Sequence, residues 1–386
     1  MADSIHVARW VQNMRALDVR VILMSSSPHR RVHPILKNLL SNDPGQRLRI
    51  SMPSWSKNFS ILFAIADLLA GDRIRGLLLA RLIARVQPDL VHLLEIQHAG
   101  YIYNRSLAFL GSNPPLLAVS NYGSDIYWFG RFESHRKKLG RLLSKTDIYT
   151  CECQRDVKLA IEQGLLGRTF QVIPNTGGID EGVINSGTAL ESTSSRRLVL
   201  VKGYHGRFGR ALVALRIIWK IRASLAGFKV ISFSSNLTTI AVATFLRIFG
   251  HVDITALRKG ALQHAEMLQL FSKARIYLGL SKSDGISTSM LEAMALGAFP
   301  IQTDTSCANE WIVSSSGGFI VNYLNEEEVR DSLLESLEND LLVDTAQKSN
   351  RDKILKSYTT KHMETRVIAL YQQILALDGG SNEPAW

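Results

Sequence analysis

The sequence predicts an α/β protein built from two Rossmann-like, doubly wound domains, and three observations lead to this fold class. The chain has 386 residues, which suits two domains of similar size better than one hydrophobic core. Short apolar runs alternate with longer amphipathic segments in both halves, as strands and covering helices of parallel sheets do. Residues 181–197, rich in Gly, Ser and Thr, separate the halves and predict a linker.

The first predicted domain covers residues 1–180. Apolar residues recur with helical spacing over residues 7–17 and 74–86, so we expect helices there. The strands predicted for this domain are residues 19–24, 90–94, 116–120, 147–150 and 171–173. Since the chain opens with a helical pattern, we expect the first strand of this domain to be absent or supplied otherwise.

The second predicted domain covers residues 198–361, and residues 362–386 form a C-terminal helix and tail. Its predicted strands are residues 198–201, 229–233, 252–255, 276–280, 299–302 and 319–321. Its predicted helices are residues 211–225, 238–249, 261–273 and 289–296. In open parallel sheets of this kind, ligands bind at the carboxyl ends of the strands.

The charge composition limits the classes of partner that we expect. The net charge of +11 and pI of about 9.6 favour anionic partners, namely nucleic acid, acidic lipid or phosphorylated ligands. The sequence shows no aromatic-interleaved basic run and no zinc finger, so we do not expect nucleic acid. It also shows no secretory signal and no uninterrupted apolar run of the ~18–20 residues that a membrane span needs. Three sparse cysteines favour a reducing, cytoplasmic location.

Residues 281–292 carry the clearest chemical signal, because they join a predicted strand to a predicted helix. A serine or threonine among residues 287–289 is expected to cap that helix. The amides of its first turn, together with the helix dipole, suit a phosphate group. Gly285 allows close approach of the backbone to a ligand.

Two carboxylates, Asp284 and Glu292, frame this loop. Carboxylates beside a phosphate site are unfavourable unless they accept hydrogen bonds from hydroxyl groups. The arrangement therefore predicts a diphosphate on the amides, a sugar at Asp284 and a ribose at Glu292. The alternative for Glu292 is an ordinary carboxylate on a helix.

The spacing from Asp284 to Glu292 resembles the acidic-x7-Glu motif of glycosyltransferase family 4, whose members are retaining enzymes of the GT-B fold. The Ala-Met-Ala-x-Gly-x-x-Pro block of residues 293–300 also matches. Residues 303–310 and 316–319 resemble later blocks of that family. Residues 172–178 resemble its Pro-Asn-Gly turn, and residues 121–126 its His-Gly-x-Asp block. The resemblance extends from about residue 90 to residue 377.

This resemblance implies GT-B architecture, with two domains facing across a cleft, and transfer of a sugar from a nucleotide-diphosphate sugar with retention of configuration. It implies neither metal nor other cofactor. The acceptor would be a saccharide or a polyprenyl-linked saccharide used in cell-surface polysaccharide assembly. The donor contacts that it implies are Asp284, Gly285, Ile286, Ser287, Ser289, Leu291, Glu292 and Glu310. For Glu310 the alternative is a helix cap.

The sequence departs from the family pattern in two contact regions. The first acidic position is usually Glu, one methylene longer than Asp284. The Gly-Arg and Lys-Gly pairs that grip the diphosphate are replaced by residues 202–210. We expect Arg207 and Arg210 to bind the diphosphate, with Lys202 in reserve, because arginine suits bidentate phosphate contacts. The alternative is a solvated basic loop.

The acceptor side is expected in the first domain, where Tyr122 stands in place of the family's usual His. His98 and Asp125 follow predicted strands, so we expect them to line the acceptor site, with Glu95 nearby. The alternative is structural polar pairing. His29 and His33 could contact an anionic acceptor, or lie in a solvated loop.

Residues 55–86 combine apolar side chains with four arginines: Arg73, Arg75, Arg81 and Arg85. They predict either a membrane-surface helix serving a lipid-linked acceptor or a helix packed on its own sheet with a basic outer face. The overall charge favours peripheral association with the inner face of the cytoplasmic membrane. Two rival functions remain open at this point: a sugar-nucleotide epimerase of similar fold, and a non-catalytic sugar-nucleotide-binding scaffold.

Overall fold

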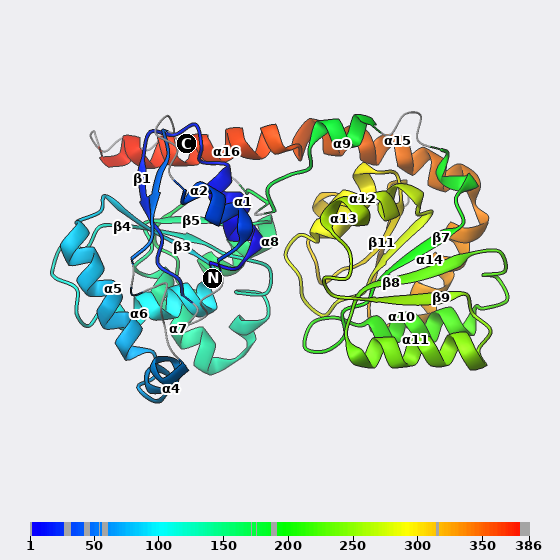
Figure 1. Cartoon of the computed structure of the whole chain (residues 1–386), viewed down its shortest axis with the longest axis horizontal. Coiled ribbons are helices and arrows are strands. Elements are labelled where there is room, and N and C mark those ends of the chain that lie inside the picture. The colour runs from blue at the N-terminus through cyan, green and yellow to red at the C-terminus, as the bar shows by residue number, and fades with distance from the viewer. Residues whose placement is uncertain are drawn as a thin grey trace. The chain divides into compact units, whose positions relative to one another are not determined.

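The computed structural model divides into two compact units, Met1–Gly178 with Lys361–Trp386, and Ile179–Thr360 (Figure 1). The chain therefore passes between the units twice. Ile179 pairs with Thr359 in a parallel bridge beside these two passages. The residues that the structure describes are 2–26, 32–41, 47–53, 55, 61–170, 172–174, 176–186, 191–313 and 316–378.

The first unit contains a parallel sheet of four strands in the order β3-β4-β5-β6, and a separate parallel pair, β1-β2. The strand bounds are β1 Arg20–Ile22, β2 Arg49–Ser51, β3 Leu90–Leu94, β4 Leu116–Ser120, β5 Ile148–Thr150 and β6 Arg168–Thr169. The strands predicted at 90–94 and 116–120 are confirmed. The strand predicted at 171–173 is wrong: the last strand is β6, and residue 171 lies outside the described residues. Both residues of β6 are exposed, so no apolar run marked it.

Helices α5, α6 and α7 lie on one side of the four-stranded sheet, and α1, α2 and α16 lie on the other (Figure 1). The predicted helix at 74–86 is confirmed as α5. The helix bounds are α1 Ile5–Gln12, α2 Pro34–Leu39, α4 Ile61–Leu69, α5 Arg73–Val86, α6 Tyr101–Ser106, α7 Glu133–Leu143, α8 Gln154–Glu162 and α16 Thr360–Asp378. Short π and 3-10 turns cover Ile96–Gly100 and Phe129–Arg131.

A buried hydrogen-bond chain fixes the C-terminal helix α16 to the first unit. The Trp10 indole donates to the Tyr371 hydroxyl at 3.0 Å, and Tyr371 lies 2.7 Å from His92 Nδ1. The other ring nitrogen of His92 lies 2.8 Å from the Ser120 hydroxyl. Burial lowers the pKa of His92 to about 3, so this ring is neutral at physiological pH. The two contacts of Tyr371 join segments more than 270 positions apart, which no local sequence pattern encodes.

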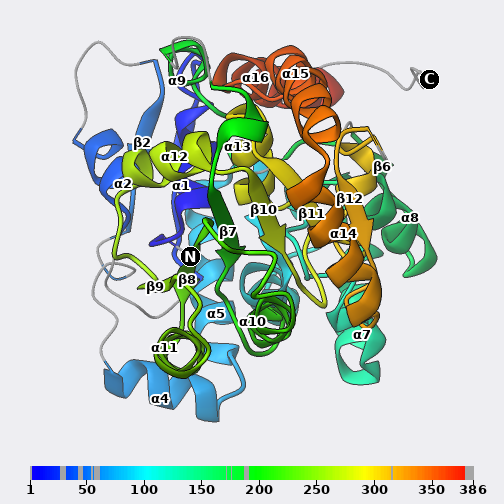
Figure 2. The same cartoon turned by 90° about the vertical axis from the view of Figure 1, so that its right-hand side faces the viewer.

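The second unit contains a parallel sheet of six strands in the order β12-β11-β10-β7-β8-β9, seen from right to left in Figure 2. The strand bounds are β7 Leu198–Lys202, β8 Lys229–Ser235, β9 Ile254–Arg258, β10 Ile276–Gly279, β11 Phe299–Thr303 and β12 Phe319–Val321. The chain runs outward from β7 to β9, then returns to β10 and runs outward to β12. This reversal makes the space beyond the carboxyl ends of β7 and β10 the expected ligand crevice.

Helices α10, α11 and α14 cover one face of this sheet, and α12, α13 and α15 cover the other. The helix bounds are α9 Glu181–Ser186, α10 Ala211–Lys220, α11 Leu237–Phe249, α12 His264–Lys273, α13 Thr288–Ala295, α14 Glu326–Glu338 and α15 Asp340–Ser357. Sequence analysis did not identify α14 and α15. Within the described residues, no helix is both long and apolar enough to cross a membrane.

The segment predicted as a linker, residues 181–197, contains α9 and a 3-10 turn at Thr193–Ser195. Arg196 is buried and donates to the carbonyls of Ala274 and Leu296, both at 3.0 Å. Burial lowers the pKa of Arg196 to about 10. The buried Arg275 donates to the Ser194 carbonyl at 2.7 Å. The end of this segment is therefore fixed to the second unit.

Candidate functional site

The switch point of the second unit brings together the two loops that sequence analysis singled out. Gly209 forms an antiparallel bridge with Ser281. The Lys282 amide donates to the Phe208 carbonyl at 2.7 Å, and the Arg210 amide donates to the Leu280 carbonyl at 3.0 Å. The basic loop after β7 is thus held beside the loop that leads from β10 to α13.

Lys202 contacts the predicted ligand loop through its ammonium group. It ends β7, and its Nζ lies 3.0 Å from Asp284 Oδ2 and 3.2 Å from the Ser287 hydroxyl. Burial works against its charge, but the neighbouring Asp284 outweighs burial and raises the pKa of Lys202. Asp284 uses its other oxygen to accept the Gly285 amide at 3.0 Å. The ammonium therefore lies between the Asp284 carboxylate and the start of α13.

Arg207 and Arg210, to which we assigned the diphosphate, take different positions. Arg207 is exposed on the loop. Arg210 is half-buried at the N-cap of α10, and its guanidinium lies 5.2 Å from the centre of the Tyr323 ring. Lys202, held in reserve by the sequence analysis, is in direct contact with Asp284.

The N-terminus of α13 differs from the expected side-chain cap. Ser287 occupies the N-cap position, but its side chain makes no cap hydrogen bond. Its hydroxyl instead lies 3.2 Å from each of Lys202 Nζ, the Tyr277 hydroxyl and the Ser289 hydroxyl. The Met290 amide donates to the Ser287 carbonyl at 3.0 Å, and without a side-chain cap the amides of Thr288 and Ser289 keep their capacity to bind an anion.

The remaining predicted donor residues lie in this segment or just after it. Ile286 and Leu291 are buried, and the Leu291 amide donates to the Ser287 carbonyl at 3.1 Å inside the helix. The Gly285 carbonyl accepts from the Cys307 amide at 2.9 Å, which holds the loop in place. Glu310 lies in a 3-10 turn, and its carbonyl accepts from Lys353 at 2.8 Å.

Glu292 has a partner that sequence analysis missed. Its side chain is nearly buried on α13, and Oε1 lies 2.7 Å from Nε2 of His264, the first residue of α12. His264 is about half-exposed. Residues 264 and 292 belong to different helices, and only the packing of α12 against α13 brings them together. No sequence spacing could have paired them.

In the first unit, Asp125 forms hydrogen bonds with the loops that follow β3 and β4. Its Oδ2 accepts the Ile96 amide at 2.8 Å and the Tyr122 amide at 3.2 Å. Burial, with the nearby Glu95 carboxylate, raises the pKa of Asp125 well above its usual range. His98 is exposed, and its amide donates to Glu95 Oε1 at 2.7 Å.

Glu95 shows a strained backbone that the sequence did not reveal. Its φ is 92°, a conformation that costs a non-glycine residue about 1–3 kcal/mol. A π-helical turn follows it, a form often found at functional sites. Burial raises the pKa of Glu95, and its Oε2 has no hydrogen-bond partner among the described residues.

Two histidines were candidates for contact with an anionic acceptor. His29 lies outside the described residues, and His33 caps α2.

Comparison with protein families gives one match in each half of the chain. Residues 1–152 match a family described as glycosyl transferase 4-like. Residues 236–369 match a family described as glycosyl transferase-like. No curated protein sequence matches the chain.

Among solved structures, sucrose-phosphate synthase from Thermosynechococcus elongatus is similar with a TM-score of 0.67 and 12% identity, covering 96% of this chain and 92% of the other. Anabaena HepE in complex with UDP and glucose gives 0.64 and 13%, covering 97% of each chain. A variant of S. aureus TarM in complex with fondaparinux, alpha-GlcNAc-glycerol and UDP gives 0.59 and 12%, covering 76% of this chain and 58% of that one.

The matched families, the two parallel-sheet units and the switch-point site agree with the expected fold and enzyme class. The structural similarity extends over nearly the whole chain for two of the three structures. The chain is a glycosyltransferase with the GT-B fold, and its two halves match the glycosyl transferase 4-like and glycosyl transferase-like family models.

Proposed function

We propose that this enzyme transfers a sugar from a nucleotide-diphosphate sugar to a saccharide acceptor, with retention of anomeric configuration and without a metal cofactor. One observation carries the proposal. Lys202 Nζ lies 3.0 Å from Asp284 and 3.2 Å from Ser287, at the N-terminus of the helix that bears Glu292. A cation, free helix amides and two carboxylates are together what a sugar diphosphate requires.

Each group has a distinct task in this proposal. The diphosphate binds the first-turn amides of α13 and Lys202, with Arg207 and Arg210 adding charge from the adjoining loop. Asp284 accepts hydrogen bonds from the sugar hydroxyls, and Glu292 accepts them from the ribose. The HepE structure, which contains UDP and glucose, supports a donor of this class.

The reaction breaks the bond between the anomeric carbon and the diphosphate oxygen, the acceptor hydroxyl oxygen forms the new bond, and the hydroxyl proton passes to the diphosphate oxygen that leaves. The leaving diphosphate gains negative charge, which Lys202 and the helix amides stabilise because they already point at it. Asp284 positions the sugar and does not attack it. Fixed side-chain cations take the role that a metal has in other transferases, so we expect chelation by EDTA to leave turnover unchanged.

We further propose a lipid-linked saccharide acceptor, with the enzyme at the cytoplasmic face of the membrane in cell-surface polysaccharide assembly. Support comes from α4, where Leu62, Leu68 and Leu69 are exposed, and from the exposed Arg81 and Arg85 on α5. Apolar and basic side chains on a helical surface suit an acidic bilayer. Arg75 instead pairs with Asp67 and Asp72, which fixes the junction of the two helices.

Isothermal titration against a panel of nucleotide sugars, followed by a transfer assay, tests the donor. We expect one sugar nucleotide to bind and to be consumed when an acceptor is present, with NMR showing the retained anomer. Glu292→Ala should weaken donor binding at least about tenfold, because a hydrogen bond to a charged group is lost. Glu335→Ala, which removes an exposed carboxylate on α14, is the matched control.

Absence of binding across the panel, or equal affinity of Glu292→Ala and the unmodified enzyme, would overturn this site. Binding without transfer or hydrolysis would leave a sugar-nucleotide-binding scaffold. Conversion of the donor to its epimer would show an epimerase.

A further inference from the structure

The outer surface of α10 and α11 carries a second concentration of exposed apolar side chains, separate from the donor site. On α11, Phe245, Ile248 and Phe249 are 56%, 55% and 68% exposed. With Leu237 they fall within one face of the helix, at the spacing of an amphipathic helix whose apolar side is turned outward. We define the aromatic-basic face as Trp219, Lys220, Arg222, Leu237, Phe245, Arg247, Ile248 and Phe249.

The aromatic rings of the aromatic-basic face lie close together at the C-terminal ends of α10 and α11. The rings of Phe245 and Phe249 pack with their centres 4.9 Å apart. Trp219, on α10, lies against the end of α11: a Cβ added to Gly250 would sit 3.2 Å from its ring. The Arg222 guanidinium lies 5.5 Å from the centre of the Trp219 ring. A contiguous apolar surface of this kind marks an interaction site, whereas scattered exposed residues do not.

The charge on and beside this face is mainly positive. Residues 192–252 contain ten lysines and arginines and not one aspartate or glutamate. Glu326, from α14, pairs with Arg216 and Lys220 at one edge. Arg222 and Arg247 flank the apolar side chains and are exposed. The surface is thus complementary to an anionic partner with an apolar interior.

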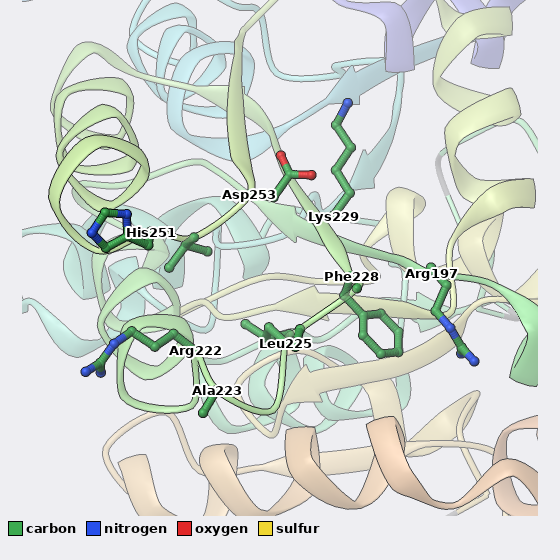
Figure 3. A pocket seen from close by; sticks show the side chains of 11 residues that line it. Arg197, Arg222, Ala223, Leu225, Phe228, Lys229, His251 and Asp253 are labelled. Atoms are coloured by element: carbon green, nitrogen blue, oxygen red, sulfur yellow. The ribbon is translucent and has the colours of Figure 1, made fainter.

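A hollow of about 510 Å³ lies next to Arg222 and is also lined by both basic and apolar side chains. Figure 3 shows Leu225 and Phe228 in its centre, with Arg222 and Arg197 on opposite sides. Lys229 and His251 also line it, and Asp253 is the single carboxylate of the lining. Because the cations border the hollow and do not converge, it is unsuited to hold one small anion. A basic rim beside the Phe228 ring suits the phosphates of a bilayer surface.

We propose that the aromatic-basic face docks the second unit on an acidic lipid bilayer. The phenyl and indole rings enter the headgroup boundary, where aromatic side chains are favoured. Lys220, Arg222 and Arg247 contact lipid phosphates. This contact rests on α10 and α11 alone, so it is independent of the donor chemistry and of the α4 surface in the first unit.

Flotation of the full chain with phosphatidylcholine vesicles, with and without phosphatidylglycerol, tests the proposal. We expect binding only to the acidic vesicles. The double variant Phe245→Ser/Phe249→Ser should lower the partition coefficient by about tenfold or more, because two rings no longer enter the bilayer. Arg222→Gln/Arg247→Gln should lower it by about fivefold per charge and weaken its salt dependence.

Leu324→Ser/Leu341→Ser removes two exposed leucines elsewhere on the same unit and should bind vesicles as the unmodified chain does. Leu62→Ser/Leu69→Ser separates the contribution of α4. All variants should keep their melting temperature and their donor affinity, so failure here is distinguishable from failure of the donor site. The proposal is overturned if Phe245→Ser/Phe249→Ser binds acidic vesicles like the unmodified chain. It is also overturned if the face instead mediates a dimer, or binds a DNA duplex, without any vesicle binding.

Discussion

The strand-end carboxylates of the two units are held by different kinds of partner. In the second unit, Asp284 faces the Lys202 ammonium and Glu292 faces the His264 imidazole. In the first unit, Asp125 accepts two backbone amides and Glu95 accepts one. Side-chain partners can rotate away when a ligand arrives, whereas backbone amides are fixed by the fold.

This difference indicates that the carboxylates of the second unit can exchange their partners for a ligand, whereas those of the first unit hold loops in place. Lys202 and Asp284 are each about one-quarter exposed, so a diphosphate and a sugar can replace part of their mutual contact. Asp125 is 6% exposed, and its removal would release two loops at once. We therefore expect substitutions in the second unit to change donor affinity, and those at Asp125 to change stability first.

Lys202→Met should have the largest effect on the donor. The substitution removes the cation that lies between Asp284 and the proposed diphosphate. The Asp284 carboxylate and the diphosphate, both negative, would then repel each other. We expect donor affinity, measured by titration calorimetry, to fall about 100-fold, the upper range for a hydrogen-bonded charge. Lys273→Met, an exposed lysine on α12, is the control. Unchanged affinity would return the diphosphate role to Arg207 and Arg210.

His264→Ala should have an intermediate effect, because His264 orients Glu292 and is assigned no contact with the reacting atoms. Loss of one hydrogen bond to a carboxylate predicts a donor KM raised about tenfold, with kcat at saturation unchanged. His264→Gln should restore part of the loss by donating a new hydrogen bond. In a Glu292→Ala background the same substitution should add nothing, because its partner is already gone. An equal effect in both backgrounds would contradict the assignment.

The sequence predicted most of the sheet framework because buried parallel strands are apolar throughout. Strands β3, β4 and β12 were located from that signal. The strands it missed or misplaced are exposed and short: β2 alternates exposed and buried residues over three positions, and β6 has two exposed residues. In these, strand pairing rather than burial decides the structure.

The local sequence was sufficient to predict those candidate site residues that lie on one continuous loop and helix. Asp284, Ser287 and Glu292 lie on one loop and helix, as their spacing predicted. The two partners from elsewhere, Lys202 and His264, depend on how β7 and α12 pack beside that loop. Arg207 and Arg210 received the phosphate assignment because arginine is the better phosphate ligand, and that assignment stays a prediction; the packing of β7 adds Lys202 beside Asp284.

Asp125→Asn should have the smallest effect, visible in the pH dependence of stability. Burial raises the pKa of Asp125, so the folded state keeps this proton to a higher pH than the unfolded state does. As pH rises above the ordinary value of about 4, the unfolded state loses the proton first, and the free energy of unfolding falls. Asn cannot titrate and can still accept the two amides. Urea unfolding at pH values upward from about 4 should therefore show a shallower slope for the variant.

Part of the residual slope should come from Glu95 and Asp156, whose pKa values are raised by burial as well. Asp89→Asn, an exposed carboxylate of the same unit, should leave the slope unchanged. The same variant decides between the two roles open to Asp125. If Asp125 only fixes the loops, Asp125→Asn alters the slope and spares the acceptor KM. If it also binds the acceptor, the slope changes in the same way and the KM for the acceptor rises as well. The second result would make the first unit's carboxylates ligands of the same kind as those of the second.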